Sequence, residues 1–276
     1  MSEPSPAERV ARLVDESAPV SAQSGGDFFG PIAARLVDLL QVRPGERAVD
    51  IGCGRGAVTF RLAEKAGPQG TVTAIDVSPA MVDLTRTQAE RAGLRQVSVE
   101  VMDATAPGLP EAGYDLIASS VVLFFLPDPA AALTRWLRLL APAGRIGVTT
   151  FGEQDEVGSA VDDLFTDYLP EGVLDPRTAG RQGPFADDAA TKALFHGAGA
   201  TWVRSLDEPT HLTFDSAAAW REFSRSVGQR GMWRFVPERE HDQLFARISR
   251  LLEGARGPDG RIVLTQIVRY TLATVA

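Results

Sequence analysis

The chain has 276 residues, of which 44% are hydrophobic, and this length and apolar content predict a folded protein with a sizeable core. Its 28 basic and 36 acidic residues give a net charge of −8, which opposes binding modes that neutralise the phosphates of a nucleic acid. Cys53 is the one cysteine, so an intramolecular disulfide and a cysteine-based zinc cluster are excluded. We therefore expect no nucleic-acid partner.

The hydropathy of the chain bears on its location. No apolar run approaches the roughly 20 residues needed to span a bilayer, so the sequence predicts no membrane span. The opening stretch MSEPSPAERVARLVDES lacks the apolar centre of a secretory signal and carries acidic residues, which favours a cytoplasmic protein. Residues 1–26 are polar and rich in proline, serine and alanine, and predict a mobile N-terminal arm ahead of one domain at residues 27–276.

Helical and strand patterns alternate through the first half of the chain. Residues 28–40 carry apolar side chains at helical spacing, and short apolar runs follow. Ser78-Pro79 and Asp128-Pro129 each pair an N-cap side chain with proline at the first helical position, and so predict the start of two helices. This alternation predicts a doubly wound, mostly parallel α/β sheet. The predicted strands in this half are 48–51, 71–75, 97–101, 116–119 and 145–150.

The regular alternation stops after Phe151, where glycine, proline and aspartate are scattered through roughly Pro184. We expect the segments at about 153–186 and 212–256 to form a helical cap that is inserted into the α/β domain. Later patterns predict helices at 187–198, 216–227 and 237–252, and strands at 201–206 and 261–272.

The strongest motif is the run Val-Asp-Ile-Gly-Cys-Gly-Arg-Gly at residues 49–56, which lies between the first predicted strand and a helical pattern. Glycines at 52, 54 and 56 let the turn adopt backbone angles closed to other residues and let a ligand approach the main chain. This arrangement predicts a nucleotide-type site. Gly52, Gly54 and Ala57 also satisfy the form G-x-G-x-x-G/A of dinucleotide sites, so the glycines alone leave both interpretations open.

Three acidic residues near the ends of predicted strands favour one interpretation. Asp50 precedes the first glycine by two residues, where its carboxylate suits a cationic amino-acid ligand and would repel a pyrophosphate. Asp76 ends the second strand and can accept hydrogen bonds from ribose hydroxyls, a feature shared with NAD sites. Asp103 follows the third strand and can accept from the exocyclic amine of adenine.

On these residues, the run from Asp50 to Phe151 resembles the S-adenosylmethionine (SAM) binding core of class I methyltransferases, close to the ubiquinone/menaquinone-type and small-molecule natural-product subgroups. The resemblance implies a Rossmann-like, seven-stranded sheet with an antiparallel last strand, which dinucleotide folds lack. It implies SAM as cofactor, with Gly52, Gly54 and Gly56 beside its methionine part and Asp50 orienting that part. Ser119 and Ser120 are implied contacts of the methionine carboxylate and the reacting methyl group.

The resemblance also assigns the nucleoside end of SAM. It implies that Asp76 holds the ribose, that Asp103 and Ala104 meet the adenine, and that Val77 and Met81 sandwich the adenine ring. Methyl transfer from a sulfonium is a direct displacement, so positioning and water exclusion are needed and a nucleophilic residue is not. A general base helps only with a neutral hydroxyl or a weakly acidic carbon.

Histidines and aromatic residues supply the candidates for acceptor chemistry. His211 is the best placed of the three histidines as a catalytic base, and no histidine shares a ligand spacing with a carboxylate, so we expect no metal site. The stretch from Trp220 to Val236 interleaves aromatic residues with arginines, which suits a flat or lipophilic acceptor bearing an anionic group; a packed cap with solvated arginines fits it equally. The candidate substrate residues are Phe124, Tyr168, Trp220, Arg225, Arg230 and Trp233.

The expected function is SAM-dependent methyl transfer to a small-molecule acceptor, with a place in secondary metabolism. Two alternatives stay open at this point. A natural-product cyclase could keep SAM as a non-methylating cofactor with the same loop motifs, and an NAD(P)-dependent oxidoreductase could use the same glycines. The oligomeric state is expected to be a monomer or a homodimer.

Overall fold

The computed structural model describes residues 28–169, 183–226 and 229–276, so the predicted arm at residues 1–26 lies outside the described ranges. The elements are, in chain order, α2 (Phe29–Leu40), β1 (Arg47–Ile51), α3 (Thr59–Ala66), β2 (Thr71–Asp76), α4 (Pro79–Arg91), β3 (Val97–Val101), β4 (Tyr114–Ser120), η1 (Leu123–Phe125), α5 (Pro129–Leu139), β5 (Leu140–Gln154), α6 (Glu156–Thr166), η2 (Gly183–Phe185), α8 (Asp188–Gly197), β6 (Trp202–Phe214), α9 (Ala217–Ser226), α10 (Arg230–Trp233), η3 (Glu238–Glu240), α11 (His241–Glu253) and β7 (Ile262–Thr274).

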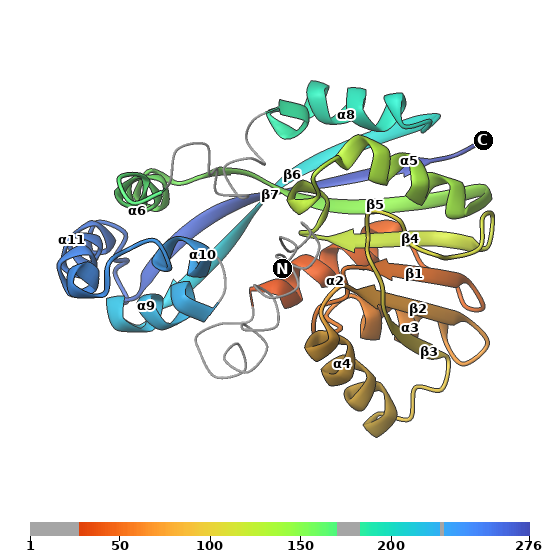
Figure 1. Ribbon diagram of the computed structural model, residues 1–276, viewed down its shortest axis with the longest axis horizontal. Coiled ribbons are helices and arrows are strands. Elements are labelled where there is room, and N and C mark those ends of the chain that lie inside the picture. The colour runs from red at the N-terminus through yellow and green to blue at the C-terminus, as the bar shows by residue number, and fades with distance from the viewer. Residues whose placement is uncertain (1–27, 170–182, 227–228) are drawn as a thin grey trace, which may run out of the picture.

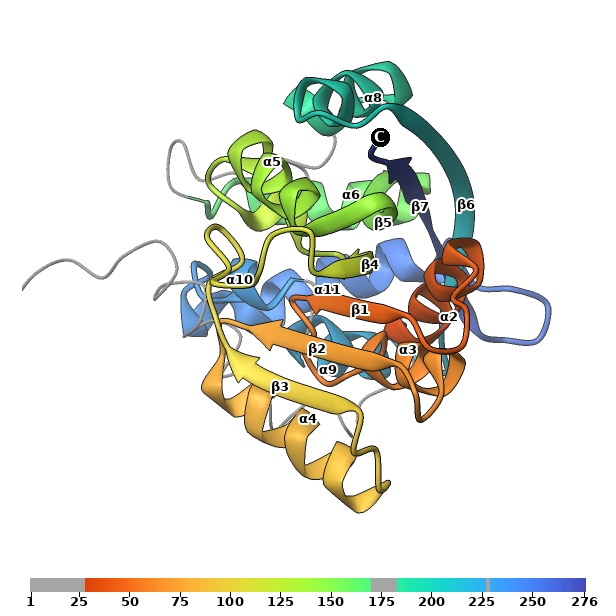
Figure 2. The same cartoon turned by 90° about the vertical axis from the view of Figure 1, so that its right-hand side faces the viewer.

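Seven strands form one sheet in the order β3-β2-β1-β4-β5-β7-β6 (Figures 1 and 2). Strands β1 to β5 pair in parallel, and β7 runs antiparallel to both β5 and β6. The predicted α/β sheet, with its antiparallel seventh strand, is therefore confirmed. The strand order reverses between β1 and β4, and ligands of open α/β sheets bind at the carboxyl ends of strands at such a reversal.

Helices cover both faces of the sheet. The connections through α3 and α4 step along the sheet in one direction and the connection through α5 steps in the other, so right-handed crossovers place α5 on the opposite face. Helix α2 shares the face of α3, where it packs so tightly on Gly147 of β5 that a Cβ there would lie 2.9 Å from Leu36 Cδ1. Helix α8 packs beside α5 and against β6.

Both predicted helix starts are confirmed by their capping hydrogen bonds. Ser78 Oγ accepts from the backbone N–H of Met81 at 3.1 Å, and Asp128 Oδ1 accepts from that of Ala131 at 2.9 Å. Each cap satisfies an N–H group that has no partner within its own helix, which fixes where the helix begins. The cap at Ser78 sets the entry of α4 directly after β2, at the carboxyl edge of the sheet.

The structure differs from the sequence prediction in the second half of the chain. Helix α6 lies in the segment 153–186 that was expected to belong to a helical cap, but its bounds were not predicted. Gly158 and two aspartates interrupt an apolar spacing that Val157, Val161 and Phe165 nevertheless provide. Asp155 caps this helix by accepting from the N–H of Gly158 at 2.7 Å. Strands β5, β6 and β7 are also longer than predicted, since they extend past the parallel sheet to carry the cap.

The cap has a hydrophobic core of its own. Helices α6, α9, α10 and α11 pack on the far halves of β6 and β7, on the left of Figure 1. Trp220, Phe165, Leu244 and Ile248 are buried in this second core, apart from the core around the parallel sheet. In the parts of the chain that the structure describes, no helix of cap or sheet layer has the length and apolar character of a membrane span.

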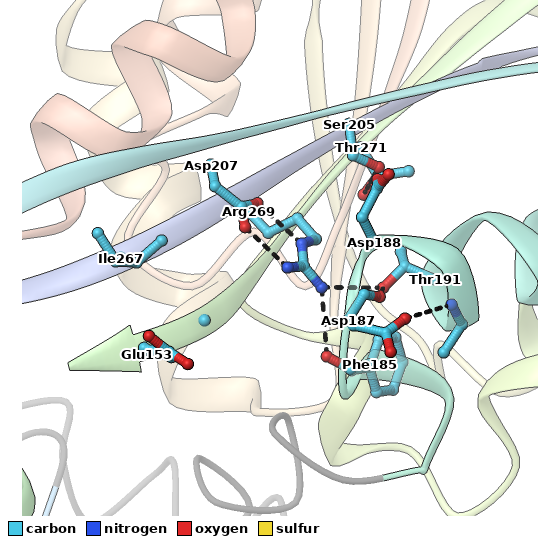
Figure 3. A network of polar contacts seen from close by, with 12 residues as sticks. Glu153, Phe185, Asp187, Asp188, Thr191, Ser205, Asp207, Ile267, Arg269 and Thr271 are labelled. Atoms are coloured by element: carbon cyan, nitrogen blue, oxygen red, sulfur yellow. Dashed lines mark hydrogen bonds and ion pairs between the residues drawn. The ribbon is translucent and has the colours of Figure 1, made fainter.

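A buried arginine joins the antiparallel pair of β6 and β7, called the hairpin below, to the start of α8 (Figure 3). Arg269 of β7 forms two hydrogen bonds with the carboxylate of Asp207 on β6, at 2.8 and 2.7 Å. Its third nitrogen, Nη1, lies 3.4 Å from both the carbonyl of Phe185 and the hydroxyl of Thr191. Bidentate pairing of this kind fixes geometry as well as charge, so it holds η2 and α8 on the hairpin.

Candidate functional site

The glycine motif forms a tight turn between β1 and α3, with φ of +76° at Gly52, +50° at Gly54 and +83° at Gly56. A Cβ at Gly52 would lie 2.3 Å from Val122 Cγ2, and one at Gly56 would lie 2.4 Å from the ring of Phe60. A Cβ at Gly54 would meet nothing within 4 Å. Two glycines are thus required by close packing, and Gly54 faces the open space that a ligand beside the main chain needs.

Asp76 connects the end of β2 to this turn. Its Oδ2 accepts from the N–H of Gly54 at 2.8 Å, and its Oδ1 accepts from the N–H of Ser78 at 2.9 Å. Thr85 of α4 donates to the carbonyl of Gly54 at 2.7 Å. Asp76 therefore shapes the glycine turn from the end of β2, at the place where the resemblance implies the ribose.

Asp50 lies beneath the turn and is 1% exposed. Its Oδ2 accepts a 2.6 Å hydrogen bond from the hydroxyl of Thr59, the first residue of α3. Burial raises the pKa of Asp50 to about 7, the Thr59 hydrogen bond offsets part of this rise, and the charge of Asp76 adds to it. Two carboxyl groups that repel each other in a buried setting favour a cationic ligand.

The residues implied for the nucleoside lie along the same edge. Asp103, beyond β3, is half-buried, and its Oδ1 accepts from the N–H of Thr105 at 2.8 Å. Met81 and Ala104 are buried and Val77 is half-buried. Because β1, β2 and β3 are parallel neighbours, the sheet brings their carboxyl ends together, and Asp50, Asp76 and Asp103 with them.

The two serines at the end of β4 have different surroundings. Ser119 is fully buried and its hydroxyl donates to the carbonyl of Ile51 at 3.0 Å, so this side chain joins β4 to β1. The implied contact of Ser119 with the ligand stays a prediction. Ser120 is half-buried at the carboxyl end of β4, with its hydroxyl 3.0 Å from Thr149 Oγ1, and remains a candidate.

These residues fit a cationic amino acid joined to adenosine. An open glycine turn, two buried carboxyl groups and a third acid beyond β3 lie along one sheet edge. The glycine turn and Asp50 fit the methionine part of SAM, Asp76 fits the ribose and Asp103 fits the adenine. When bound, SAM supplies an electrophilic methyl group on a sulfonium. Within the described ranges, no three histidine, cysteine, aspartate or glutamate side chains gather in a way that could hold a metal ion.

A row of phenylalanine rings runs from the end of β4 to the cap. Phe124 stacks on Phe125 at 4.5 Å between centroids and lies 5.5 Å from Phe151 of β5. Phe28 lies 6.0 Å from Phe151 and 6.3 Å from Phe223 of α9, and it packs against both hydrophobic cores. Phe124 was named as a candidate substrate residue, and Phe223 belongs to the aromatic stretch from Trp220 to Val236. Phe28 was not named as a candidate, although it forms an aromatic pair in the sequence with Phe29, the first residue of α2.

The two cap tryptophans are interior residues. Trp220 is 1% exposed, and Trp233 is buried with its Nε1 donating to Ser224 Oγ at 2.9 Å. Both residues belong to the core of the cap, and their contact with substrate stays a prediction. Arg225 is exposed, lies 5.0 Å over the Trp233 ring and is 2.8 Å from His241 Nδ1, whereas the Nη1 atom of Arg230 is buried. The contact of these two arginines with substrate stays a prediction.

Tyr168 and His211 also lie elsewhere than expected. Burial and a hydrogen bond with Glu240 raise the pKa of Tyr168. Because Glu240 ends η3, this hydrogen bond places the phenol beside η3. His211 is exposed on β6, with its Nδ1 3.1 Å from Thr265 Oγ1. It alternates along the strand with Leu212, which packs on the cap core, so it points to the opposite face of the hairpin. The structure does not place His211 as a catalytic base.

Replacing Gly54 by alanine should separate ligand space from backbone strain. Gly93, which follows α4, has φ of +69° and equally open surroundings, so Gly93→Ala is a matched control. Both changes should lower the free energy of unfolding by about 1 kcal/mol, because alanine disfavours positive φ. Only Gly54→Ala should also weaken binding of S-adenosylhomocysteine, by roughly tenfold, in a calorimetric titration. Equal affinities in the two variants would place the ligand away from Gly54.

Comparison with known proteins agrees with this geometry. A family model described as a methyltransferase domain matches residues 43–194, more than half of the chain. The nocamycin O-methyltransferase of Saccharothrix syringae is 36% identical over 273 residues, covering 94% of this chain and 95% of that protein. The aklanonic acid methyltransferase DauC of Streptomyces sp. (strain C5) is 40% identical over 167 residues, covering 60% of this chain and 76% of that protein.

A solved structure shares the fold. The crystal structure of a SAM-dependent methyltransferase from Aquifex aeolicus superposes with a TM-score of 0.52 at 14% identity, covering 99% of this chain and all of that one. The family match over more than half of the chain and the 36% identity over nearly its full length establish the family independently of the fold. The chain belongs to the class I SAM-dependent methyltransferases.

Proposed function

We propose that this methyltransferase transfers the methyl group of SAM to an oxygen of a flat, largely apolar natural product. The observation that carries the cofactor side of this proposal is the pair of buried carboxyl groups, Asp50 and Asp76, beside an open glycine turn. Their mutual repulsion is relieved by a positive charge, and SAM brings a sulfonium and an ammonium group together. An NAD(P) pyrophosphate would add negative charge at the same place.

The acceptor side of the proposal draws on the phenylalanine row. Phe124, Phe151, Phe28 and Phe223 form a chain of ring contacts between the end of β4 and the cap, and we propose that this row borders the acceptor. Walls of this kind favour flat ring systems, which stack on aromatic faces and lose apolar surface to water. The names of two relatives, an O-methyltransferase for nocamycin and a methyltransferase for aklanonic acid, support a natural-product acceptor and favour oxygen as the methylated atom.

The residues of the chain contribute positioning rather than covalent chemistry. Direct displacement needs the acceptor oxygen in line with the sulfur–methyl bond, and an aligned, water-free site can supply an effective molarity of order 10⁵ M or more. Asp50, Asp76 and the glycine turn hold the donor, and the aromatic row excludes water. With His211 on the far face of the hairpin, we propose an acceptor oxygen that ionises readily, such as a phenol, an enol or a carboxylic acid.

The test is to incubate the protein with SAM and aklanonic acid, and to follow both products by mass spectrometry. We expect S-adenosylhomocysteine and a product heavier by one methylene to appear in equal amounts. A product of unchanged mass, formed without S-adenosylhomocysteine, would favour a cyclase. Binding of NAD(P) in place of SAM would favour an oxidoreductase, and failure to bind SAM or S-adenosylhomocysteine at millimolar concentration would refute the proposal.

We extend the proposal to the setting of the protein. The net charge of −8 and the methyltransferases of small molecules among the relatives support an enzyme without a nucleic-acid substrate. Our proposal also includes a cytoplasmic location and a monomeric or homodimeric state. Light scattering of the purified protein would give its oligomeric state, and an unchanged reaction rate after nuclease treatment would support the absence of a nucleic-acid partner.

A further inference from the structure

The turn that follows β4 contains a strained residue. Val121 has φ of +60°, in the left-handed region that a β-branched residue rarely adopts. Glycine would occupy this conformation without steric cost, whereas valine brings its Cβ too close to the backbone. Strain of this kind persists only where neighbouring groups hold it, and it concentrates at functional sites.

Thr149 of β5 supplies the groups that hold this turn. The N–H of Val121 donates to both acceptors of Thr149, the carbonyl oxygen at 3.1 Å and the hydroxyl at 3.0 Å. Thr149 is fully buried, and its hydroxyl also lies 3.0 Å from that of Ser120. One buried side chain therefore contacts both residues at which β4 ends and the chain turns.

The held turn shapes two sides of the glycine site. The residue after Val121 is Val122, whose Cγ2 lies so close to Gly52 that a Cβ there would be 2.3 Å away. Because the Thr149 hydroxyl accepts from the N–H of Val121, its own proton is available to Ser120 Oγ. The proton of Ser120 can then point out of the sheet, toward a carboxylate bound at this edge.

We propose that Thr149 is a positioning residue for the cofactor: its hydroxyl stabilises the left-handed turn at Val121, and thereby sets Val122 against Gly52 and orients the Ser120 hydroxyl. This inference rests on the proposed binding of SAM at the carboxyl edge of the sheet. Thr149 itself is buried and acts through Val121 and Ser120.

The first test measures affinity for S-adenosylhomocysteine by calorimetry in Thr149→Val and Thr149→Ser. Valine has the shape of threonine without the hydroxyl, so Thr149→Val should weaken binding about tenfold, and Thr149→Ser should bind within about twofold of the parent. Thr150→Val is the matched control, because the Thr150 hydroxyl is buried one residue further along β5 and has no hydrogen-bond partner among the described residues. It should leave affinity unchanged.

The second test is a double-mutant cycle with Val121→Gly. Glycine adopts the left-handed conformation unaided, so the loss caused by Thr149→Val should shrink from about tenfold to about threefold or less when Val121→Gly is also present. A role of Thr149 in packing alone would give the same loss in both backgrounds. The cycle uses binding to folded protein, checked for each variant by its thermal transition.

Three outcomes would overturn the inference: unchanged affinity in Thr149→Val, an equal loss in Thr149→Ser, or an additive cycle. Each of these presupposes that the parent protein binds S-adenosylhomocysteine. If the parent does not bind it, the proposed function fails as well, so the two failures are distinguishable by the titration of the parent.

Discussion

Replacing Asp76 by alanine should weaken the binding of S-adenosylhomocysteine on the order of 100-fold, or about 3 kcal/mol. Two effects add. The variant loses the acceptor expected for the ribose hydroxyls, and it leaves the N–H groups of Gly54 and Ser78 without the carboxylate that now holds them at 2.8 and 2.9 Å. Hydrogen bonds to a charged acceptor contribute about 1.5–3 kcal/mol each, so the loss of several of them dominates the binding energy at this edge.

Two further variants sharpen this prediction. Asp83→Ala removes an exposed acid of α4, the helix that follows Asp76. Asp83 is paired with Arg86 one turn away, and its loss should leave affinity within a factor of two. Asp76→Asn keeps one acceptor oxygen and should fall between the parent and Asp76→Ala. Calorimetric titration measures all three. Undiminished binding in Asp76→Ala would remove this residue from the cofactor site.

The free energy of unfolding should fall as the pH rises from about 4 to about 7, through the buried carboxyl group of Asp50. Burial raises the pKa of Asp50 from 3.8 to about 7 in the folded state, so in this range the unfolded chain releases a proton that the folded chain keeps. The stabilisation is complete below the unfolded pKa and is lost as the pH approaches the folded one. About three pKa units correspond to roughly 4 kcal/mol.

Asp50→Asn isolates this contribution from the other acidic groups. Asparagine stays neutral and can still accept the hydrogen bond from Thr59, so its stability should lack the Asp50 component. The difference in Tm between variant and parent should rise by on the order of 10 °C from pH 4 to pH 8, in favour of the variant. Exposed acids such as Glu208, whose pKa is lowered by Arg35, act equally in both proteins and cancel. A difference that is constant with pH would show that Asp50 ionises as freely as in the unfolded chain.

Local chemistry made the sheet half of the protein predictable. Apolar runs of strand length, the caps at Ser78 and Asp128 and the glycines at 52, 54 and 56 each act within a few residues, and the structure has all of them in the expected elements. The cap was harder to predict for two reasons. Helix α6 carries a glycine and two aspartates, and the far halves of β6 and β7 are stabilised by a second core whose residues come from distant parts of the chain.

The sequence by itself determined the alternation of strands and helices through β5, the glycine turn and the acids near the ends of neighbouring strands, since these depend on backbone preferences and on short-range spacing. Only the tertiary structure decided which side chains face the site. Trp220 and Trp233 are residue types that are common at binding surfaces, but here the helices of the cap bury them. His211 is exposed on β6, on the face of that strand opposite to the cap core. Thr149 and Phe28 contact residues that are far away in the chain. Such contacts and the burial that they produce depend on the packing of the whole fold, so no local sequence pattern predicts them.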